Sequence, residues 1–282
     1  MCTVPLLKAI CRECYSEPEA VYQTLRRKGM DVVTISDHDS IDAAETLRHY
    51  PDFFISEEVT CRTPCGTELH VGVYDLTERH HVEIQRRRND LPRLVAYLNE
   101  QQLFCSINHA FSALTGRRSL EDFVWFDGAF SGVEVRNGHV LERCNRLAER
   151  MARHSGRAMV GGSDAHTLDS LASACTCVPG ARNKTEFLEG LRHGRGRVQG
   201  GSGSLWRLTR DLVQIASALM AEKPVAKLLT PLMLAIPATT LLNYLLEDLF
   251  ARYWGRRWER WQGFDGGSSA GRMRATPGEA GA

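Results

Sequence analysis

Short apolar runs recur along this chain, and most of them end in a carboxylate, an amide or an imidazole. The first run, "MDVVTI" (30–35), leads directly into "SDHDSID". Buried strands are predicted at 31–35, 53–56, 69–74, 103–108, 132–136 and 157–163. Amphipathic helices are predicted between them at 17–29, 81–101 and 141–156. This alternation predicts an α/β fold with a mainly parallel sheet, either open or closed into a barrel.

Polar residues collect where these strands end, and most of them are carboxylates and imidazoles. They are Asp37, His38, Asp39, Glu57, Glu58, His70, Asn108, His109, Glu134, Arg136, Asn137, Asp164 and His166. In a parallel α/β fold the carboxyl ends of the strands share one face. So many carboxylates and imidazoles at one rim would repel or stay unpaired without cations among them, and this mixture of ligands suits Zn, Mn or Fe. A single such residue is more often structural, but the set as a whole predicts a metal centre.

Several of these stretches resemble, in order, the motifs of a known family. "TISDHDS", "ISEEVT" followed by "ELHVGVY", "SINHA" and "GGSDAH" resemble successive motifs of the PHP (polymerase and histidinol phosphatase) phosphoesterases. The resemblance covers about residues 13–200. It implies a distorted (β/α)7 TIM-like barrel with two or three divalent ions and no organic cofactor. It also implies hydrolysis of a small phosphorylated substrate by a metal-activated water.

The resemblance also implies roles for individual residues. The implied metal ligands are His38, Glu58, His70, His109, Asp164 and His166, with Asp37 and Asp39 either as ligands or as partners of ligands. One of His38, His109 and His166 would protonate the leaving oxygen. Glu58 takes the family's acidic position because "VT" follows it, so Glu57 is expected to point to the other side of its strand.

Two further residues, Arg136 and Asn137, match a subgroup of the family in which they lie beside the site. Arg136 would hold a phosphate oxygen through its planar guanidinium. A salt bridge from Arg136 to Glu134 or to another neighbour is the equal alternative.

The match departs from the family at the N-terminus. Members begin with a strand bearing an H-x-H motif, whereas no histidine precedes His38 here, so the first strand and two ligands are expected to be missing. A start codon placed too far downstream, a truncated product and a degenerate relative that binds fewer metals are the three explanations, and the first two are favoured. Low activity is expected of the chain as written. The alternative function is a non-catalytic binding or regulatory module.

Composition narrows the partners and the compartment. The 35 basic and 34 acidic residues give a net charge of +1, which offers no general attraction for nucleic acid. The nine cysteines and the absence of a signal-peptide pattern predict a reducing, cytoplasmic location. Cys11 and Cys14 form a lone C-x-x-C and are expected to be free thiols.

Composition also divides the chain. Residues 1–200 are predicted to form the PHP-like domain, with "GRGRVQGGSGS" (194–204) as a linker or flexible edge. Residues 201–262 are predicted to be a helical extension, and 263–282 a disordered tail.

Leu228–Leu246 in this extension lacks any charge over 19 residues, close to the ~18–20 that span a bilayer. Pro231 and Pro237 oppose a membrane segment, whereas Trp254, Trp258 and Trp261 resemble an interfacial belt. A buried or oligomerising helical hairpin is favoured. The alternative is membrane contact, which would make the protein peripheral or anchored and its activity that of a membrane-associated phosphoesterase.

Overall fold

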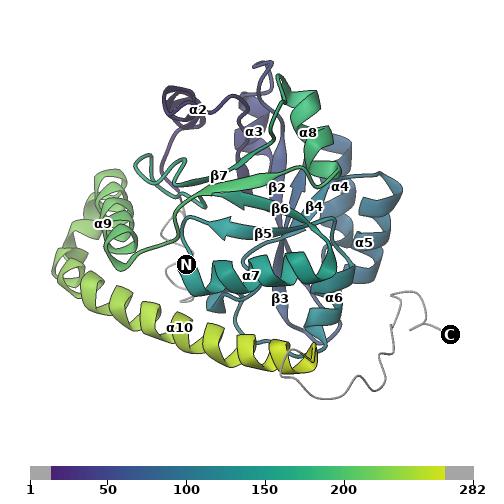
Figure 1. The fold of residues 1–282 in the computed structure, drawn as a ribbon. Coiled ribbons are helices and arrows are strands. Elements are labelled where there is room, and N and C mark those ends of the chain that lie inside the picture. The colour runs from purple at the N-terminus through teal and green to yellow at the C-terminus, as the bar shows by residue number, and fades with distance from the viewer. Residues whose placement is uncertain (1–13, 264–282) are drawn as a thin grey trace.

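The computed structural model describes residues 14–263 and contains a six-stranded sheet with helices around it (Figure 1). The strands lie in the order β1 (Ser36–His38), β2 (Ser56–Arg62), β3 (Glu68–Tyr74), β4 (Cys105–Ile107), β5 (Gly132–Asn137) and β6 (Ala158–Gly162). The shorter helices are α2 (Pro18–Arg27), α3 (Asp42–Thr46), α4 (Glu78–Arg87), α5 (Leu91–Glu100), α6 (Asp122–Gly128), α7 (Glu142–Ser155) and α8 (Lys184–Arg192), with a 3₁₀ turn η1 (Ala113–Thr115). The α/β class predicted from the alternation is therefore confirmed.

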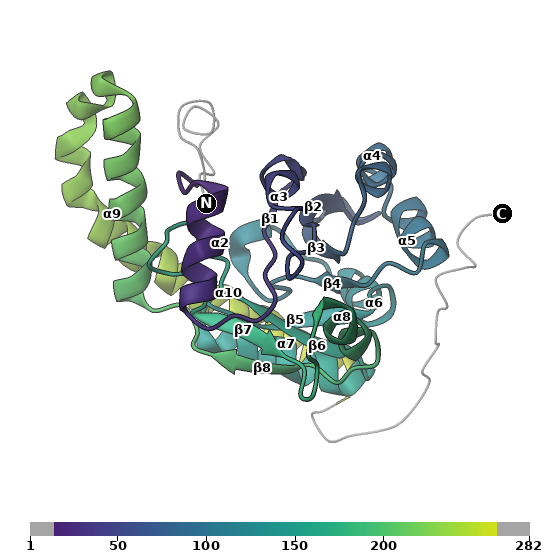
Figure 2. The ribbon, with the colours of Figure 1, turned by 90° about the horizontal axis from the view of Figure 1, so that it is seen from above.

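The sheet curls but stays open. Helices α3, α4, α5 and α6 form an arc around its outer side (Figure 2). In the described residues no ladder joins β6 back to β1, and a cavity of about 160 Å³ lies between residues 32–34 and residues 160–163. The part of the chain that the structure describes is a half-barrel.

One strand runs against the others. The β1–β2, β4–β5 and β5–β6 pairs are parallel, whereas β3 is antiparallel to both β2 and β4. A tight turn joins β2 to β3: the Thr63 N–H donates to the Thr67 carbonyl at 2.8 Å, and Gly66 has φ +80°. The expected mainly parallel sheet is thus a mixed one.

The first two strands begin later than predicted. At 31–35 and 53–56 the structure has only an isolated bridge between Val33 and Phe53, and the regular ladder starts at Ser36 and Ser56. Between them hydroxyl groups replace ladder bonds, since Thr34 Oγ1 donates to the Phe54 carbonyl at 2.8 Å and Ser56 Oγ to the Ile35 carbonyl at 3.2 Å. Asp37, His38, Glu57 and Glu58 therefore lie inside strands, whereas Asp39 follows β1.

Two other predicted elements differ from the structure. The single helix expected at 81–101 is two helices, because the Asp90 side chain accepts from the Arg93 N–H and caps α5, with Pro92 in its first turn. The expected linker at 194–204 contains strand β8 (Arg197–Gly200), which pairs with β7 (Ala174–Cys177).

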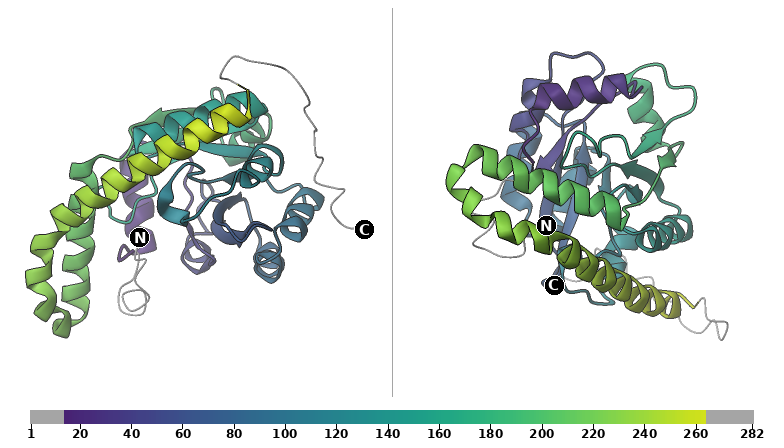
Figure 3. Two further views of the ribbon diagram at one scale, coloured as in Figure 1. Left: turned by 90° about the horizontal axis from the view of Figure 1, so that it is seen from below. Right: turned by 90° about the vertical axis from the view of Figure 1, so that its left-hand side faces the viewer.

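The last part of the described chain is helical. It consists of α9 (Leu205–Glu222), the 3₁₀ segment η2 (Pro224–Ala235) and α10 (Ile236–Trp261). Trp258 and Ala251 of α10 are fully buried in the main core, and Gly255 lets α10 approach α7, since a Cβ there would lie 2.8 Å from both Leu147 methyl groups. The other end of α10 forms a hairpin with α9 that extends beyond the body (Figure 3).

Two predictions fall partly or wholly outside the described residues. The tail expected to be disordered begins at 263, and residues 264–282 are not described; neither is Cys11 of the C-x-x-C. Cys14 is a free thiol, as are the other described cysteines.

Candidate metal centre

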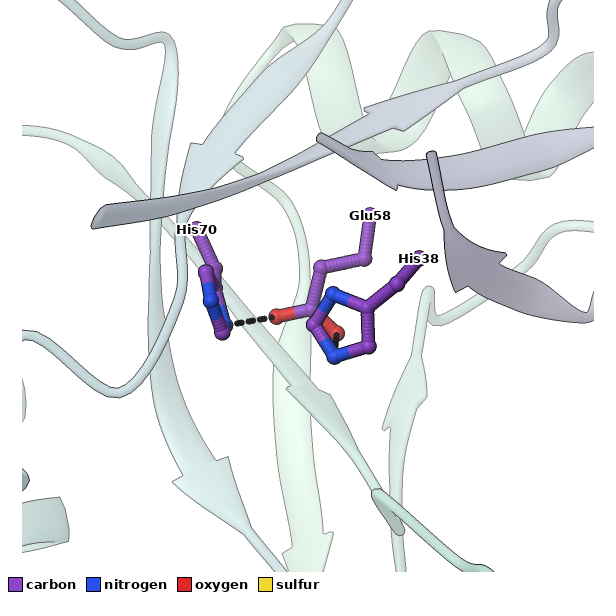
Figure 4. Close-up of side chains that lie close together, drawn as sticks. All are labelled: His38, Glu58 and His70. Carbon is purple, nitrogen blue, oxygen red and sulfur yellow. Dashed lines mark ion pairs between the residues drawn. The ribbon is translucent and has the colours of Figure 1, made fainter. Parts of the chain in front are cut away.

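Three strands place their metal-binding side chains on one face of the sheet. His38 of β1 pairs in register with Glu58 of β2, so the two side chains lie next to each other. His70 of β3 pairs with Thr60, two residues beyond Glu58 on the same face. The Glu58 carboxylate lies 3.2 Å from His70 Nδ1 and 3.9 Å from His38 Nε2 (Figure 4). One ligand atom from each of these three residues lies within 4.8 Å of the others.

The antiparallel direction of β3 explains why a residue near the start of a strand joins residues near the ends of others. His70 is the third residue of β3, whereas His38 ends β1. Because β3 runs in the opposite direction, its beginning lies at the same rim as the carboxyl ends of its neighbours.

The segment after β4 adds a third imidazole to Glu58. His109 Nε2 lies 3.1 Å from Glu58 Oε1 and 3.2 Å from His70 Nδ1. Asn108 Nδ2 donates to the same carboxylate oxygen at 3.2 Å. Gly72, opposite Glu58, leaves room for this amide, since a Cβ there would lie 3.2 Å from Asn108 Oδ1.

The charges of this cluster depend on one another. Burial would raise the pKa of Glu58, but hydrogen bonds from His109 and His70 hold its pKa well below the ordinary value. Burial would lower the pKa of His109, but the Glu58 carboxylate raises it to about 9. Burial lowers the pKa of His70 in spite of its bond to Glu58. The site therefore favours an ionised carboxylate with a compensating positive charge beside it.

Glu57 faces away from this cluster, as strand alternation predicts. Its carboxylate lies 2.7 Å from His81 Nδ1 and accepts from Gln85 Nε2 at 3.1 Å, and both of these belong to α4. Burial raises the pKa of Glu57.

The two aspartates beside His38 are placed differently from it. Asp37 precedes His38 in β1, so alternation puts its side chain on the opposite face. Asp39 has φ +55°, accepts from the Thr60 N–H at 2.8 Å and forms an ion pair with Arg88. The structure therefore brings Asp39 to the end of α4 and not to the three imidazoles.

A chain of hydrogen bonds through Glu134 and Asn137 connects His109 with Asp164. Glu134 of β5 accepts from the His109 N–H at 3.0 Å and from Asn137 Nδ2 at 3.0 Å. The same Asn137 amide donates to Asp164 Oδ2 at 3.1 Å. Burial raises the pKa of Glu134 to about 7. Asn137 is thus a spacer between two carboxylates.

His109 and Asp164 both have positive φ, +32° and +47°, which non-glycine residues rarely adopt. Such strained backbone is common at functional sites.

His166 lies in a second group, where the structure adds two residues that the sequence reasoning missed. His166 Nδ1 lies 3.0 Å from the Asp164 carbonyl, and its ring centroid is 5.5 Å from that of His139. Asp211 of α9 is fully buried, accepts from Thr167 at 3.0 Å and Ser170 at 2.5 Å, and lies 4.0 Å from His139 Nδ1. Asp211 is the only acid in "LWRLTRDLVQIASALM", which is the signal that could have pointed to it.

Arg136 is engaged elsewhere. Its guanidinium donates to Glu142 at 2.7 Å and to Ser202 at 3.3 Å. Of the two alternatives drawn from the sequence, the structure has the salt bridge to a neighbour, and that neighbour is Glu142.

The residues present fit a divalent cation. Three imidazoles surround one carboxylate, and the structure gives the buried Nδ1 atom of His109 no hydrogen-bond partner. Imidazole and carboxylate together are a usual donor set for Zn, Mn or Fe. His38, Glu58, His70 and His109 would hold such an ion.

Comparisons with known proteins agree with this fold. A family model described as "PHP-associated" matches residues 142–195, and a search of curated proteins finds no match. The structure of PsfC from Pseudomonas syringae superposes with a TM-score of 0.53 at 16% identity, covering 71% of this chain and 88% of that one.

Two further solved structures are more distant. A proposed metal-dependent phosphoesterase from Bifidobacterium adolescentis has a TM-score of 0.41 at 11% identity, with 64% of this chain and 92% of that one covered. The lesion-specific endonuclease PfuEndoQ from Pyrococcus furiosus has a TM-score of 0.45 at 16% identity, with 62% and 50% covered.

The fold and site define an α/β half-barrel with a histidine-rich site suited to a divalent cation. A PHP-associated family model thus matches one segment of this chain, residues 142–195, and the ordered motifs of the chain resemble those of the PHP family.

Proposed function

We propose that this protein is a metal-dependent hydrolase of phosphate esters. The observation that carries the proposal is the set of three imidazoles, from His38, His70 and His109, around the ionised carboxylate of Glu58. Such a set binds a cation strongly because the carboxylate supplies charge and the imidazoles supply neutral nitrogen ligands.

Each residue has a task in this proposal. Divalent ions, when bound, supply Lewis acidity towards a phosphoryl oxygen and lower the pKa of water. Glu58 fixes the direction of the His70 and His109 rings through its two hydrogen bonds. Asn137 and Glu134 fix Asp164 relative to His109, which sets the spacing of the two groups of ligands.

The three histidines considered as proton donors differ in how far their side chains are exposed. The His109 side chain is 4% exposed, so a leaving group cannot contact it, whereas His38 is 32% exposed. The Nδ1 atom of His166 is paired with the Asp164 carbonyl, which directs its Nε2 atom towards other partners. We therefore propose that His109 is a ligand, and that either His38 or His166 is not a ligand and instead protonates the leaving oxygen.

Two adjacent glutamates provide the test. Glu58→Gln removes the central charge, and we expect at least about a hundredfold weaker binding of Mn²⁺ or Zn²⁺ by calorimetry, with loss of p-nitrophenyl phosphate hydrolysis. Glu57→Gln is the matched control, since that side chain is also buried but contacts α4. It should leave metal binding unchanged. Equal metal affinity in the two variants, or hydrolysis that survives Glu58→Gln, would contradict the proposal.

A further inference from the structure

The exposed apolar side chains of this protein are concentrated on one hairpin. Of the 16 large hydrophobic residues that are exposed in the described chain, 13 lie between Trp206 and Trp261. The highest exposures are in η2, where Leu228 is 81% and Leu234 87% exposed. Scattered exposed leucines are normal, but a concentration of this kind marks an interaction surface. We call residues 224–246 the hairpin tip.

The charged residues of 223–246, which are the hairpin tip and the residue before it, are all basic. Between Glu222 and Glu247 the only charged residues are Lys223 and Lys227. A second copy of this chain would bring like charges together at such a surface, whereas anionic lipid headgroups would attract them. Charge therefore favours a lipid surface over self-association.

The threonine hydroxyls of the hairpin tip form hydrogen bonds within it. Thr230 donates to the Lys227 carbonyl at 2.6 Å, and Thr240 donates to the Ile236 carbonyl at 2.7 Å. Thr239 is within reach of the Ala235 carbonyl at 3.1 Å. Hydroxyls bonded to their own helix cost little to remove from water, which is the condition for contact with acyl chains.

The packing of α10 excludes a full crossing of the membrane. Thr230–Trp261 is the one helix in residues 14–263 that is long and apolar enough to span a bilayer. However, Ala251 and Trp258 are fully buried in the core, and Asp248 pairs with Arg143 at 2.7 Å. Only residues 236–246 of α10 extend past this contact, roughly 16 Å of helix at 1.5 Å per residue, against a hydrocarbon core of ~30 Å.

We propose that the hairpin tip seats in the interfacial region of one leaflet of an anionic bilayer. Its leucines enter the acyl boundary, and Lys223 and Lys227 lie at the level of the phosphates. The body of the protein, held to α10 through α7, stays in water.

Vesicle co-sedimentation of the full chain tests this proposal. We expect binding to vesicles of phosphatidylcholine with phosphatidylglycerol, and weaker binding to phosphatidylcholine alone or at high salt. The triple variant Leu228→Asp/Leu232→Asp/Leu234→Asp should bind at least about tenfold more weakly. Lys227→Gln should bind about fivefold more weakly. All four side chains are exposed, so circular dichroism should show an unchanged fold.

Val82→Asp on α4 is the matched control, since Val82 is an exposed apolar residue outside the hairpin, and it should bind like the wild type. If the protein binds neither kind of vesicle, the proposal is overturned. It is also overturned if the triple variant binds like the wild type. A dimer in solution that the triple variant dissociates, with no vesicle binding, would assign the surface to a second copy and would also overturn it.

Discussion

At the scale of the residue, Glu57 and Glu58 show how strongly the surroundings decide what a carboxylate does. Strand alternation directs Glu58 to three imidazoles, which hold its pKa low, and directs Glu57 to α4, where burial raises its pKa. One carboxylate is thus prepared to bind a cation, and the other is a structural acid. The sequence contains the alternation, but the partners come from segments up to 51 residues away.

Asp127 in α6 carries a pH-dependent prediction. Burial raises its pKa to about 6 from an ordinary 3.8. The native state therefore holds this proton more tightly than the unfolded chain does, so stability rises as the pH falls from about 6 towards 3.8. Asp127→Asn cannot ionise, and we expect its free energy of unfolding to exceed that of the wild type by about 2 kcal/mol near pH 8, with no difference below about pH 4.

Denaturant unfolding across this pH range measures the effect. Asp75→Asn is the control, because that side chain is 41% exposed and contacts only the surface residue Arg192 among the described ion pairs. A constant gap between Asp127→Asn and the wild type at every pH would show that ionisation is not the cause.

At the scale of the element, α9 belongs to the site although it lies in the helical extension. Its Asp211 accepts hydrogen bonds from Thr167 and Ser170, which lie just after the proposed ligands Asp164 and His166 in the chain. Asp211 is thus a positioning residue for this loop. The segment expected to be a linker instead forms β8. Because β8 pairs with β7, the connection to α9 is held by a strand ladder.

Asp211→Asn tests this positioning role. The two hydroxyls lose a charged acceptor, so we expect the free energy of unfolding to fall by about 2 kcal/mol. We also expect the affinity for Mn²⁺ or Zn²⁺ to fall about tenfold, as is usual when a partner of metal ligands is removed. Asp169→Asn, on the same loop but exposed, is the control. A loss of stability with unchanged metal affinity would mean that Asp211 is structural alone.

At the scale of the whole molecule, the half-barrel brings the proposed metal ligands together from separate parts of the chain. Because the unfolded chain cannot hold His38, Glu58, His70 and His109 together, a bound ion stabilises the native state selectively. When the free concentration of Mn²⁺ or Zn²⁺ is a hundred times its Kd, binding should raise the free energy of unfolding by about 2.7 kcal/mol and the Tm by about 5–10 °C. Scanning calorimetry with and without chelator measures this shift. The shift should vanish in Glu58→Gln, and its persistence there would place the ion elsewhere.

Much of the fold could be predicted from local pattern. The positions of α2, α7, β3, β5 and β6 follow from apolar periodicity and turn residues, which act over a few neighbours in the chain. The direction of β3 and the late start of β1 and β2 could not be predicted. The late start of β1 and β2 depends on hydroxyl bonds such as that from Thr34 to Phe54, which lie 20 residues apart in the chain. The direction of β3 depends on the antiparallel ladder that it forms with β2, which is longer than the strand predicted there.

The sequence by itself determined which residues are able to bind a cation, because imidazole and carboxylate chemistry is a property of the side chain. It also determined which side of β2 each glutamate faces, because alternation is a property of the strand. Only the tertiary structure decided which of these residues meet. It brought His109 to Glu58, turned Asp39 to Arg88 and Arg136 to Glu142, and added Asp211 from α9. Ion pairs and hydrogen bonds act over a few ångströms in space, and only the folded chain brings distant segments within that range.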